Sequence, residues 1–361
     1  MIIGIYTDAH FSISSSILTG KAEGTGLSKR LDCLVKSFEW MYKKFDEKGV
    51  DLIINCGDLT DSDVLRAEEN AALAKSLSFS RKVSEIHLLG NHDIKDASRN
   101  FSSIELLSGY PFIRVIRNLE EENINGLKLI FAPFTDKEKD KVQINRTARD
   151  CQEPCVLFSH LAYKGYGLWD ILAQEGLNKD ILLENTNLRR IFNGHIHQAL
   201  DMERYHQIGS LAGGSFSDSY KNGFPGIIIY NTETDSIERI NNPYSFLFIN
   251  RSFSSSSEIN EYLKKLPENK KCLLAKVPLN LRDSMIAYLG DHKEDLNLEG
   301  FRVRHVFSED KIKGLPADNE TENEYRARTE AEILHDFFLE EASSLPYEIE
   351  VMDRFLEKHF S

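Results

Sequence analysis

Short apolar runs alternate with amphipathic segments along the first two thirds of the chain. Three runs typical of buried strands are each followed by a stretch in which apolar residues recur at helical spacing. The expected strands are Ile2–Tyr6, Leu52–Asn55 and Glu85–Leu89, and the expected helices are Leu27–Lys48, Ala67–Ser78 and about Ser102–Leu107. Strands separated by helices pair in parallel through right-handed crossovers. The pattern therefore predicts an α/β core with helices outside the sheet.

A second set of short apolar runs follows, with less helical sequence between them. Asn125-Gly126 is a hairpin-type turn signal, and the strand-like segments on its two sides are Val115–Arg117 and Leu127–Phe131. The other expected strands are Val156–Ser159, Arg190–Asn193 and a second hairpin of Ile227–Tyr230 and Ile237–Ile240. We expect these elements to complete a first domain, residues 1–243, with a mixed sheet.

The pattern changes after residue 243. Residues 244–307 predict a small α+β module, with helices at Glu258–Leu266 and Asp283–Leu289 and strands at Cys272–Val277 and Phe301–Phe307. Residues 308–323 are polar and predict a linker. Residues 324–361 contain two amphipathic segments, which predict a helix-loop-helix. Whether this pair binds a partner or folds back on the module is left open by the sequence.

Five short polar motifs each come just after a strand-like run, where an open α/β sheet collects its functional groups. They are Asp8-Ala-His10, Gly57-Asp58-Leu-Thr-Asp61, Gly90-Asn91-His92-Asp93, His160, and Gly194-His195-Ile-His197. The Asp-x-His and His-x-His spacings place both side chains on one side of an extended segment, so each pair can hold one ion or span two. Carboxylate, amide and imidazole ligands together suit Mn, Fe or Zn. The motifs therefore predict a metal site.

The number of candidate ligands indicates two metal ions rather than one. Seven side chains exceed what one ion takes from protein while keeping an open position: Asp8, His10, Asp58, Asn91, His160, His195 and His197. Two ions about 3.5–4 Å apart would use them all, activate water and clamp a phosphoryl group. His92 could protonate the leaving oxygen. Taken singly, Asp8 or Asp58 could be a helix N-cap and His160 a structural residue, but the whole set favours the metal site.

In this order, the motifs resemble those of the calcineurin-like metallophosphoesterase superfamily. The resemblance implies an α/β fold, a four-layer α/β/β/α sandwich that hydrolyses phosphate esters at a two-metal site. It implies that one metal is held by Asp8, His10 and His197 and the other by Asn91, His160 and His195. It also implies that Asp58 bridges the two metals and that His92 is the catalytic histidine.

Within the superfamily, the chain resembles the SbcD-type DNA nuclease subunits. Ile208-Gly209-Ser210 and Gly226–Thr232 are similar to the segment after the last motif of that family, although Leu211 replaces the usual proline. Family members add a small DNA-capping domain and a C-terminal helix-loop-helix that binds the coiled coil of an SbcC-like ATPase. Residues 244–307 and 324–361 fit these additions in position and size. Asp61 stands where some members have a histidine; whether it orients His92, stabilises a helix start or does neither stays open.

The resemblance implies a Mn-dependent DNA nuclease, with Mg, Fe or Zn as other candidate metals. It also implies an SbcC-like ATPase partner and a homodimer within a heterotetramer, for which the helices near Ala67–Ser78 and Ser102–Leu107 are the candidate contact. A stand-alone phosphodiesterase or phosphatase is the alternative, and it leaves the last third of the chain unexplained. A non-enzymatic scaffold is disfavoured, since the ligand set is complete.

Charge and composition change this picture little. The 361-residue chain has a net charge of −13, which by itself disfavours non-specific binding of nucleic acid. Residues 309–361, with 15 acidic and 6 basic residues, carry −9 of that charge. No apolar run suits a membrane span, and the N-terminus does not resemble a signal peptide. With five scattered cysteines, the sequence predicts a cytoplasmic protein with reduced thiols.

Overall fold

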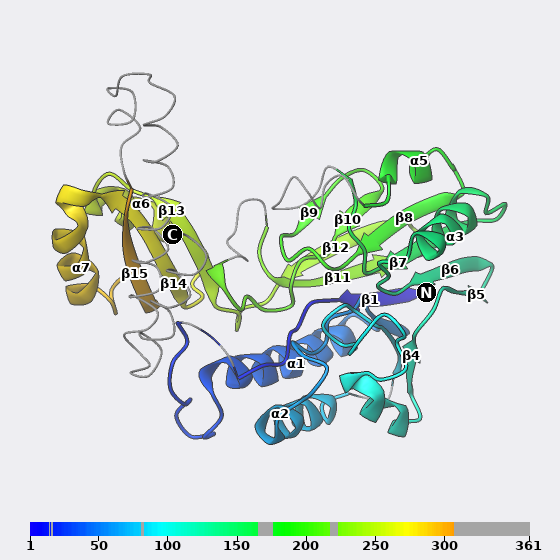
Figure 1. Ribbon diagram of the computed structural model, residues 1–361, viewed down its shortest axis with the longest axis horizontal. Coiled ribbons are helices and arrows are strands. Elements are labelled where there is room, and N and C mark those ends of the chain that lie inside the picture. The colour runs from blue at the N-terminus through cyan, green and yellow to red at the C-terminus, as the bar shows by residue number, and fades with distance from the viewer. Residues whose placement is uncertain (14, 16, 81–82, 165–175, 217–222, 307–361) are drawn as a thin grey trace, which may run out of the picture. The chain divides into compact units, whose positions relative to one another are not determined.

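The computed structural model describes residues 1–13, 15, 17–80, 83–164, 176–216 and 223–306 (Figure 1). The chain divides into two compact units, Met1–Val306 and Phe307–Ser361. The predicted linker at 308–323 and helix pair at 324–361 therefore lie outside the described residues. Within the described ranges, none of the helices combines the length and apolar character that crossing a membrane requires. The five cysteines are buried and unpaired.

Two six-stranded sheets form the larger part of the first unit. The first sheet has the order β12-β11-β1-β2-β3-β4, with β1 to β4 parallel and β11 antiparallel to β1. Its strands are β1 (Ile2–Tyr6), β2 (Leu52–Asn55), β3 (Ser84–Leu88), β4 (Ile113–Ile116), β11 (Gly226–Asn231) and β12 (Ser236–Asn241). The predicted parallel core and the hairpin near residues 227–240 are thus confirmed.

The second sheet has the order β5-β6-β7-β8-β10-β9. Its strands are β5 (Glu120–Ile124), β6 (Leu127–Ala132), β7 (Cys155–Ser159), β8 (Leu188–Asn193), β9 (Leu200–Asp201) and β10 (Tyr205–Gln207). Strands β6, β7 and β8 are parallel, so they end at the same edge of the sheet. That edge holds part of the site described below.

Three apolar clusters show that the sheets and helices form four layers. Helices α1 (Lys29–Glu47) and α2 (Ala67–Leu77) pack on the outer face of the first sheet. Ile3 and Ile5 point to the opposite face, where they pack with β6 and β7 residues such as Leu129 and Phe158. Helices α3 (Glu138–Arg149) and α5 (Lys179–Leu183) cover the outer face of the second sheet. The expected α/β/β/α sandwich is confirmed.

Helix α1 shows how the sequence sets these layers. Ser28 caps its start by accepting a hydrogen bond from the Leu31 amide, and Gly49 follows its end at a φ of 63°. Phe38 and Phe45 lie on its buried stripe. Gly4 of β1 faces Phe45, and a Cβ at this glycine would lie 2.7 Å from the ring. The bare backbone therefore lets α1 approach the sheet closely.

The structure corrects the predicted hairpin around Asn125-Gly126. The partner of β6 is β5, while the predicted strand at Val115–Arg117 corresponds to β4 of the other sheet. β5 has the sequence Glu-Glu-Glu-Asn-Ile and lies at the edge of its sheet, where three of its five residues are exposed. It therefore lacks the apolar pattern that predicts a strand. The predicted helix at Ser102–Leu107 is a 3-10 helix, η1 (Ser103–Gly109).

Residues 247–306 form a third, parallel sheet with the order β13-β14-β15. Its elements are β13 (Leu247–Ser252), α6 (Ser256–Lys264), β14 (Lys271–Pro278), the short η3 (Leu279–Leu281), α7 (Arg282–Asp291) and β15 (Leu298–Val306). Ile249, Leu273 and Val303 pack with Ile259 and Leu289 of the two helices. The module has its own core, and its two helices and strands β14 and β15 lie close to the predicted segments. Strand β13 was not predicted, and because all three strands are parallel with a helix between successive strands, the module is α/β rather than α+β.

Candidate metal centre

The sequence-predicted ligands gather from loops at the carboxyl ends of strands in both sheets. Asp8, Asp58 and Asn91 follow β1, β2 and β3 of the first sheet. His160 follows β7, and His195 and His197 follow β8 of the second sheet. Backbone hydrogen bonds join neighbouring loops, from Asp8 N to Gly57 O (3.0 Å) and from Gly194 N to Ser159 O (2.9 Å). The two sheets therefore bring all seven candidate ligands to one place.

Four of these residues occupy a backbone conformation that L-residues seldom adopt. Asp8, His10, Asp58 and His195 have φ values of 49°, 48°, 50° and 70°. Such a conformation costs on the order of 1–3 kcal/mol per residue and persists where the surrounding structure enforces it. Clustered at one site, the four turns indicate loops shaped for function rather than for stability.

The first ligand cluster comprises Asp8, His10 and His197. The Nε2 atoms of His10 and His197 are 3.0 Å apart and lie 3.7 and 3.5 Å from Asp8 Oδ1. Asp8 Oδ2 accepts hydrogen bonds from Thr7 Oγ1 (2.7 Å) and the His195 amide (3.1 Å). Asp8 Oδ1 is buried and accepts none. A divalent cation would satisfy this oxygen, so these residues fit a metal ion.

The second ligand cluster comprises Asp58, His160 and His195, with the amide oxygen of Asn91 beside it. Asn91 Oδ1 lies 3.2 Å from His160 Nε2 and 2.9 Å from His195 Nδ1. His160 Nδ1 donates to the carbonyl oxygen of Cys56 (2.6 Å), which leaves Nε2 for a metal. This donor set also fits a divalent cation.

Asp58 lies between the two clusters. Its Oδ2 atom is 3.2 Å from His160 Nε2 in the second cluster and 3.6 Å from His10 Nε2 in the first. Its Oδ1 atom accepts a hydrogen bond from the His92 amide (2.9 Å). Asp58 is therefore placed where one carboxylate could contact two ions.

Glycines next to the ligands leave room that any side chain would fill. A Cβ on Gly90 would lie 2.0 Å from Asp58 Oδ1, and one on Gly57 would lie 2.3 Å from His160 Nδ1. A Cβ on Gly194 would lie 2.3 Å from Thr7 Oγ1. Contacts this short do not occur, so the ligand loops can approach one another only where these positions lack a side chain.

The electrostatics of the site suit cations. Burial alone would lower the pKa of His160, but the carboxylates of Asp58 and Asp8 raise it to about 9. Burial would likewise raise the pKa of Asp58, yet His160 and the other nearby imidazoles lower it. Burial and the neighbouring His160 lower the pKa of His195 to about 4. Ionised carboxylates among imidazoles provide the charge that divalent ions require, and metal binding there would displace protons from imidazoles.

His92 and Asp61 lie beside the ligands. The His92 ring packs edge-on against His10, with centroids 4.7 Å apart, and its side chain is 42% exposed. His92 Nδ1 donates to the backbone carbonyl of Asp61 (3.1 Å), whereas the Asp61 carboxylate lies 3.1 Å from His10 Nδ1. Asp61 thus holds His92 through its backbone and orients the candidate ligand His10 through its side chain.

Several supporting residues escaped the sequence analysis. Buried Asp93 accepts hydrogen bonds from the Thr60 amide and hydroxyl and from the Gly90 amide. Buried Arg30 of α1 donates to the carbonyls of Ala9, Ala212 and Gly213 and so fixes the loop between Asp8 and His10. Asn193 links the ends of β7 and β8 through Ser159 and Leu161. Asp93 belongs to the Gly90-Asn91-His92-Asp93 motif, but the sequence assigned it no role. No motif marks Arg30 or Asn193, because their partners lie far away in sequence.

The fold and the paired ligand clusters define a class of phosphoester hydrolases with a dinuclear divalent metal site. Residues 1–199 match the family model of the calcineurin-like phosphoesterases, and since this is more than half of the chain, the protein belongs to that family. The family resemblance drawn from the motifs is confirmed.

Solved structures similar to this chain include other phosphoesterases. An archaeal phosphodiesterase is 15% identical, with 66% of this chain and 99% of that chain covered and a TM-score of 0.35. A dimetal phosphatase from Danio rerio is 12% identical, with 63% and 91% covered and a TM-score of 0.41. The E. coli phosphoesterase Yfce is 14% identical, with 67% and 100% covered and a TM-score of 0.32. No curated protein sequence matches the chain.

Proposed function

We propose that the protein is a metal-dependent DNA nuclease subunit that hydrolyses phosphodiester bonds with an SbcC-like coiled-coil ATPase in DNA end processing, recombination or repair. The observation that carries this proposal is the chain beyond the last ligand motif. Ile208-Gly209-Ser210 resembles the SbcD-type segment, and Ser210 N donates to His197 O (3.1 Å), so this segment braces a candidate ligand. The β13–β15 module then follows where that family has a DNA-capping domain.

For the chemistry, we assign one metal to Asp8, His10 and His197, the other to Asn91, His160 and His195, and a bridging position to Asp58. Two divalent ions, when bound, polarise the phosphoryl group and acidify the attacking water. We propose Mn as the metal because the resemblance to the SbcD-type subunits implies it, and the donor set is also compatible with Mg, Fe or Zn.

His92 is the proton donor in this proposal. Its Nδ1–H is held by the Asp61 carbonyl, so in the imidazolium form the second ring proton is on Nε2 and can pass to the leaving oxygen, which leaves the neutral imidazole behind. Its exposed position at the edge of the ligand clusters allows a substrate to reach it.

An assay on linear double-stranded DNA tests the proposal. The full chain is incubated with Mn, with Mg or with EDTA, with and without the ATPase partner and ATP, beside bis(p-nitrophenyl) phosphate as a generic diester. We expect DNA cleavage that requires the metal. Hydrolysis of the generic diester alone, under every condition, would contradict the nuclease proposal and favour a stand-alone phosphodiesterase.

The partner part of the proposal rests on residues 324–361 and has its own test. A chain that ends at residue 323 should lose ATPase binding in pull-down experiments but keep metal-dependent hydrolysis of the generic diester. Normal partner binding by the shortened chain would contradict this assignment.

We also propose that the protein is cytoplasmic and that it forms a homodimer, in which α2 and η1 make the contact between the two copies. Leu106 of η1 and nearby Phe101 are 42% and 71% exposed. Burial of such side chains against a second copy would remove apolar surface from water. Analytical ultracentrifugation of the wild type and of Phe101→Ser tests it, and a wild-type monomer at micromolar concentration would contradict it.

A further inference from the structure

Two cavities that share a lining residue, together called the trough below, lie beside the candidate metal centre. The smaller one, about 170 Å³, is lined by Asn91, Phe134 and Asp136 among others. The larger one, about 680 Å³, is lined by Asp136 as well, so the two adjoin at that residue. Phe134 ties the trough to the candidate ligands, since its ring lies 5.9 Å from that of His195 and 6.5 Å from that of His160. A substrate held at the metal centre can therefore extend into the larger cavity.

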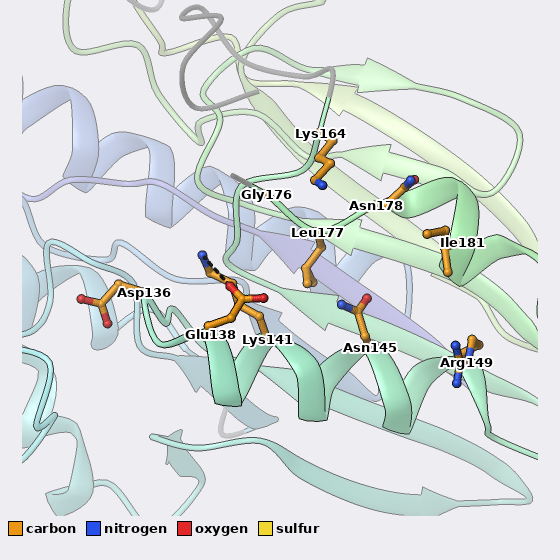
Figure 2. A pocket seen from close by; sticks show the side chains of 10 residues that line it. All are labelled: Asp136, Glu138, Lys141, Asn145, Arg149, Lys164, Gly176, Leu177, Asn178 and Ile181. Atoms are coloured by element: carbon orange, nitrogen blue, oxygen red, sulfur yellow. Dashed lines mark ion pairs between the residues drawn. The ribbon is translucent and has the colours of Figure 1, made fainter. Parts of the chain in front are cut away.

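The far part of the trough is lined by cations and amides. Lys141, Asn145 and Arg149 come from successive turns of α3, and Lys164 and Asn178 lie on the opposite wall (Figure 2). The two carboxylates of the larger cavity, Asp136 and Glu138, lie at its metal-side end, at or before the first residue of α3. The smaller cavity has two cations, Lys95 and Arg99, and two carboxylates, Asp96 and Asp136. The larger cavity has three cations and two carboxylates, so it is the more basic of the two, although the chain as a whole carries a charge of −13.

One of the ion pairs along this wall is exposed and therefore weak. Arg149 pairs with Asp150 on the helix surface, and both side chains are at least half exposed. An exposed pair of this kind contributes about 0–1 kcal/mol. Lys141 lies 3.9 Å from Glu138, with its own side chain 19% exposed and that of Glu138 80% exposed, so this pair is long and open to solvent on the carboxylate side. A phosphate can compete with such contacts through stronger charge-assisted hydrogen bonds.

The spacing along α3 matches a chain of phosphates rather than a single one. Lys141, Asn145 and Arg149 are four residues apart, so they share one face of the helix. From Lys141 to Arg149 the helix rises about 12 Å, which is long enough for a segment with several backbone phosphates rather than a single one.

We propose that this trough binds one strand of a polynucleotide next to the phosphate at the metal centre, with Lys141, Asn145, Arg149 and Lys164 contacting successive backbone phosphates. The inference rests on the proposed nuclease function and deepens it, because it assigns the residues that select a polymer over a small phosphodiester. These residues position the substrate and take no part in the chemical step.

The test compares two double variants that remove the same charge from the same helix. Lys141→Ala/Arg149→Ala removes two trough cations, and Lys139→Ala/Arg146→Ala removes two exposed cations of α3 that do not line the cavity. Binding of a fluorescent single-stranded DNA 12-mer is measured by anisotropy in EDTA, at several salt concentrations. Hydrolysis of bis(p-nitrophenyl) phosphate with Mn is measured in parallel.

We expect the trough variant to bind DNA roughly tenfold more weakly and the control variant to bind within about twofold of wild type. The slope of log affinity against log salt should become shallower by about 1.4 in the trough variant, since two phosphate contacts are lost. Hydrolysis of the small diester should be unchanged in both variants.

Four outcomes would overturn the inference. The first is unchanged DNA binding by the trough variant, and the second is an equal loss in the control variant. The third is a loss confined to a phosphopeptide probe tested beside the DNA. The fourth is an equal loss on the small diester, which would show damage to the metal centre. A wild type that neither binds nor cuts DNA contradicts the proposed function instead, so the two failures are distinguishable.

Discussion

At the residue scale, His92 differs from the candidate ligands in its exposure to solvent. Its side chain is 42% exposed, whereas those of His10, His160 and His197 are 9%, 0% and 29% exposed. It contacts the ligand region through its ring and through the Asp61 carbonyl. A group in this position can act on substrate without holding a metal.

We predict that His92→Ala lowers kcat by about 10²- to 10⁴-fold, the usual contribution of a general acid, without loss of metal. Steady-state kinetics on bis(p-nitrophenyl) phosphate and metal analysis of the purified protein check the two parts. His292→Ala, at an exposed position of the β13–β15 module, is the control. Full activity of His92→Ala would refute the assigned role.

We expect Gly90 to be needed for metal binding, although it offers no ligand atom. A Cβ there would lie 2.0 Å from Asp58 Oδ1, so Gly90→Ala must displace the carboxylate placed between the two clusters. We predict that this variant binds less than half of the wild-type metal and loses most of its activity. Gly109→Ala, where no atom lies within 4 Å of the added Cβ, should behave as wild type. Wild-type metal content in Gly90→Ala would show that the loop relaxes without cost.

At the scale of elements, the apolar pattern predicts an element well where one face is buried and poorly where little is buried. Helix α1 has buried side chains at helical spacing, and the sequence places it within two residues of its observed bounds. Helix α3 buries only Ile144 and Ala148 of its 12 residues, so no apolar stripe reveals it. β5 is hidden for the same reason, since its residues are mostly acidic.

We predict that Phe38→Ala destabilises the fold by about 3–5 kcal/mol, because the Phe38 ring is fully buried between α1 and the first sheet. Glu39→Ala, on the exposed side of the same helix, should change stability by less than about 0.5 kcal/mol. Urea unfolding followed by circular dichroism measures both. Similar midpoints for the two variants would contradict the packing described for α1.

At the scale of the whole molecule, the metal centre joins the two sheets, since its ligands come from loops of both. It also concentrates buried carboxylates that repel one another without cations. Metal binding should therefore stabilise the whole sandwich rather than one loop.

We predict that Mn raises the Tm relative to EDTA and that free Mn at 100 times its Kd stabilises the fold by about 2.7 kcal/mol. Asp58→Ala should abolish this Mn-dependent shift, because both clusters lose a shared carboxylate. Differential scanning calorimetry measures the shift. The same Tm with Mn and with EDTA would contradict a metal centre that spans the sheets.

The sequence by itself determined the strands that end at the site, the loops that carry Asp8, Asp58, Asn91, His160, His195 and His197, and the family. These features depend on local pattern: a buried strand, a glycine at a tight turn and a ligand within a few residues. Only the tertiary structure decided that Asp61 orients His10, that Arg30 fixes the Ala9 carbonyl, and that α3 and Lys164 line one cavity. The reason is physical, because these contacts join segments that are distant in sequence and leave no periodic trace along the chain.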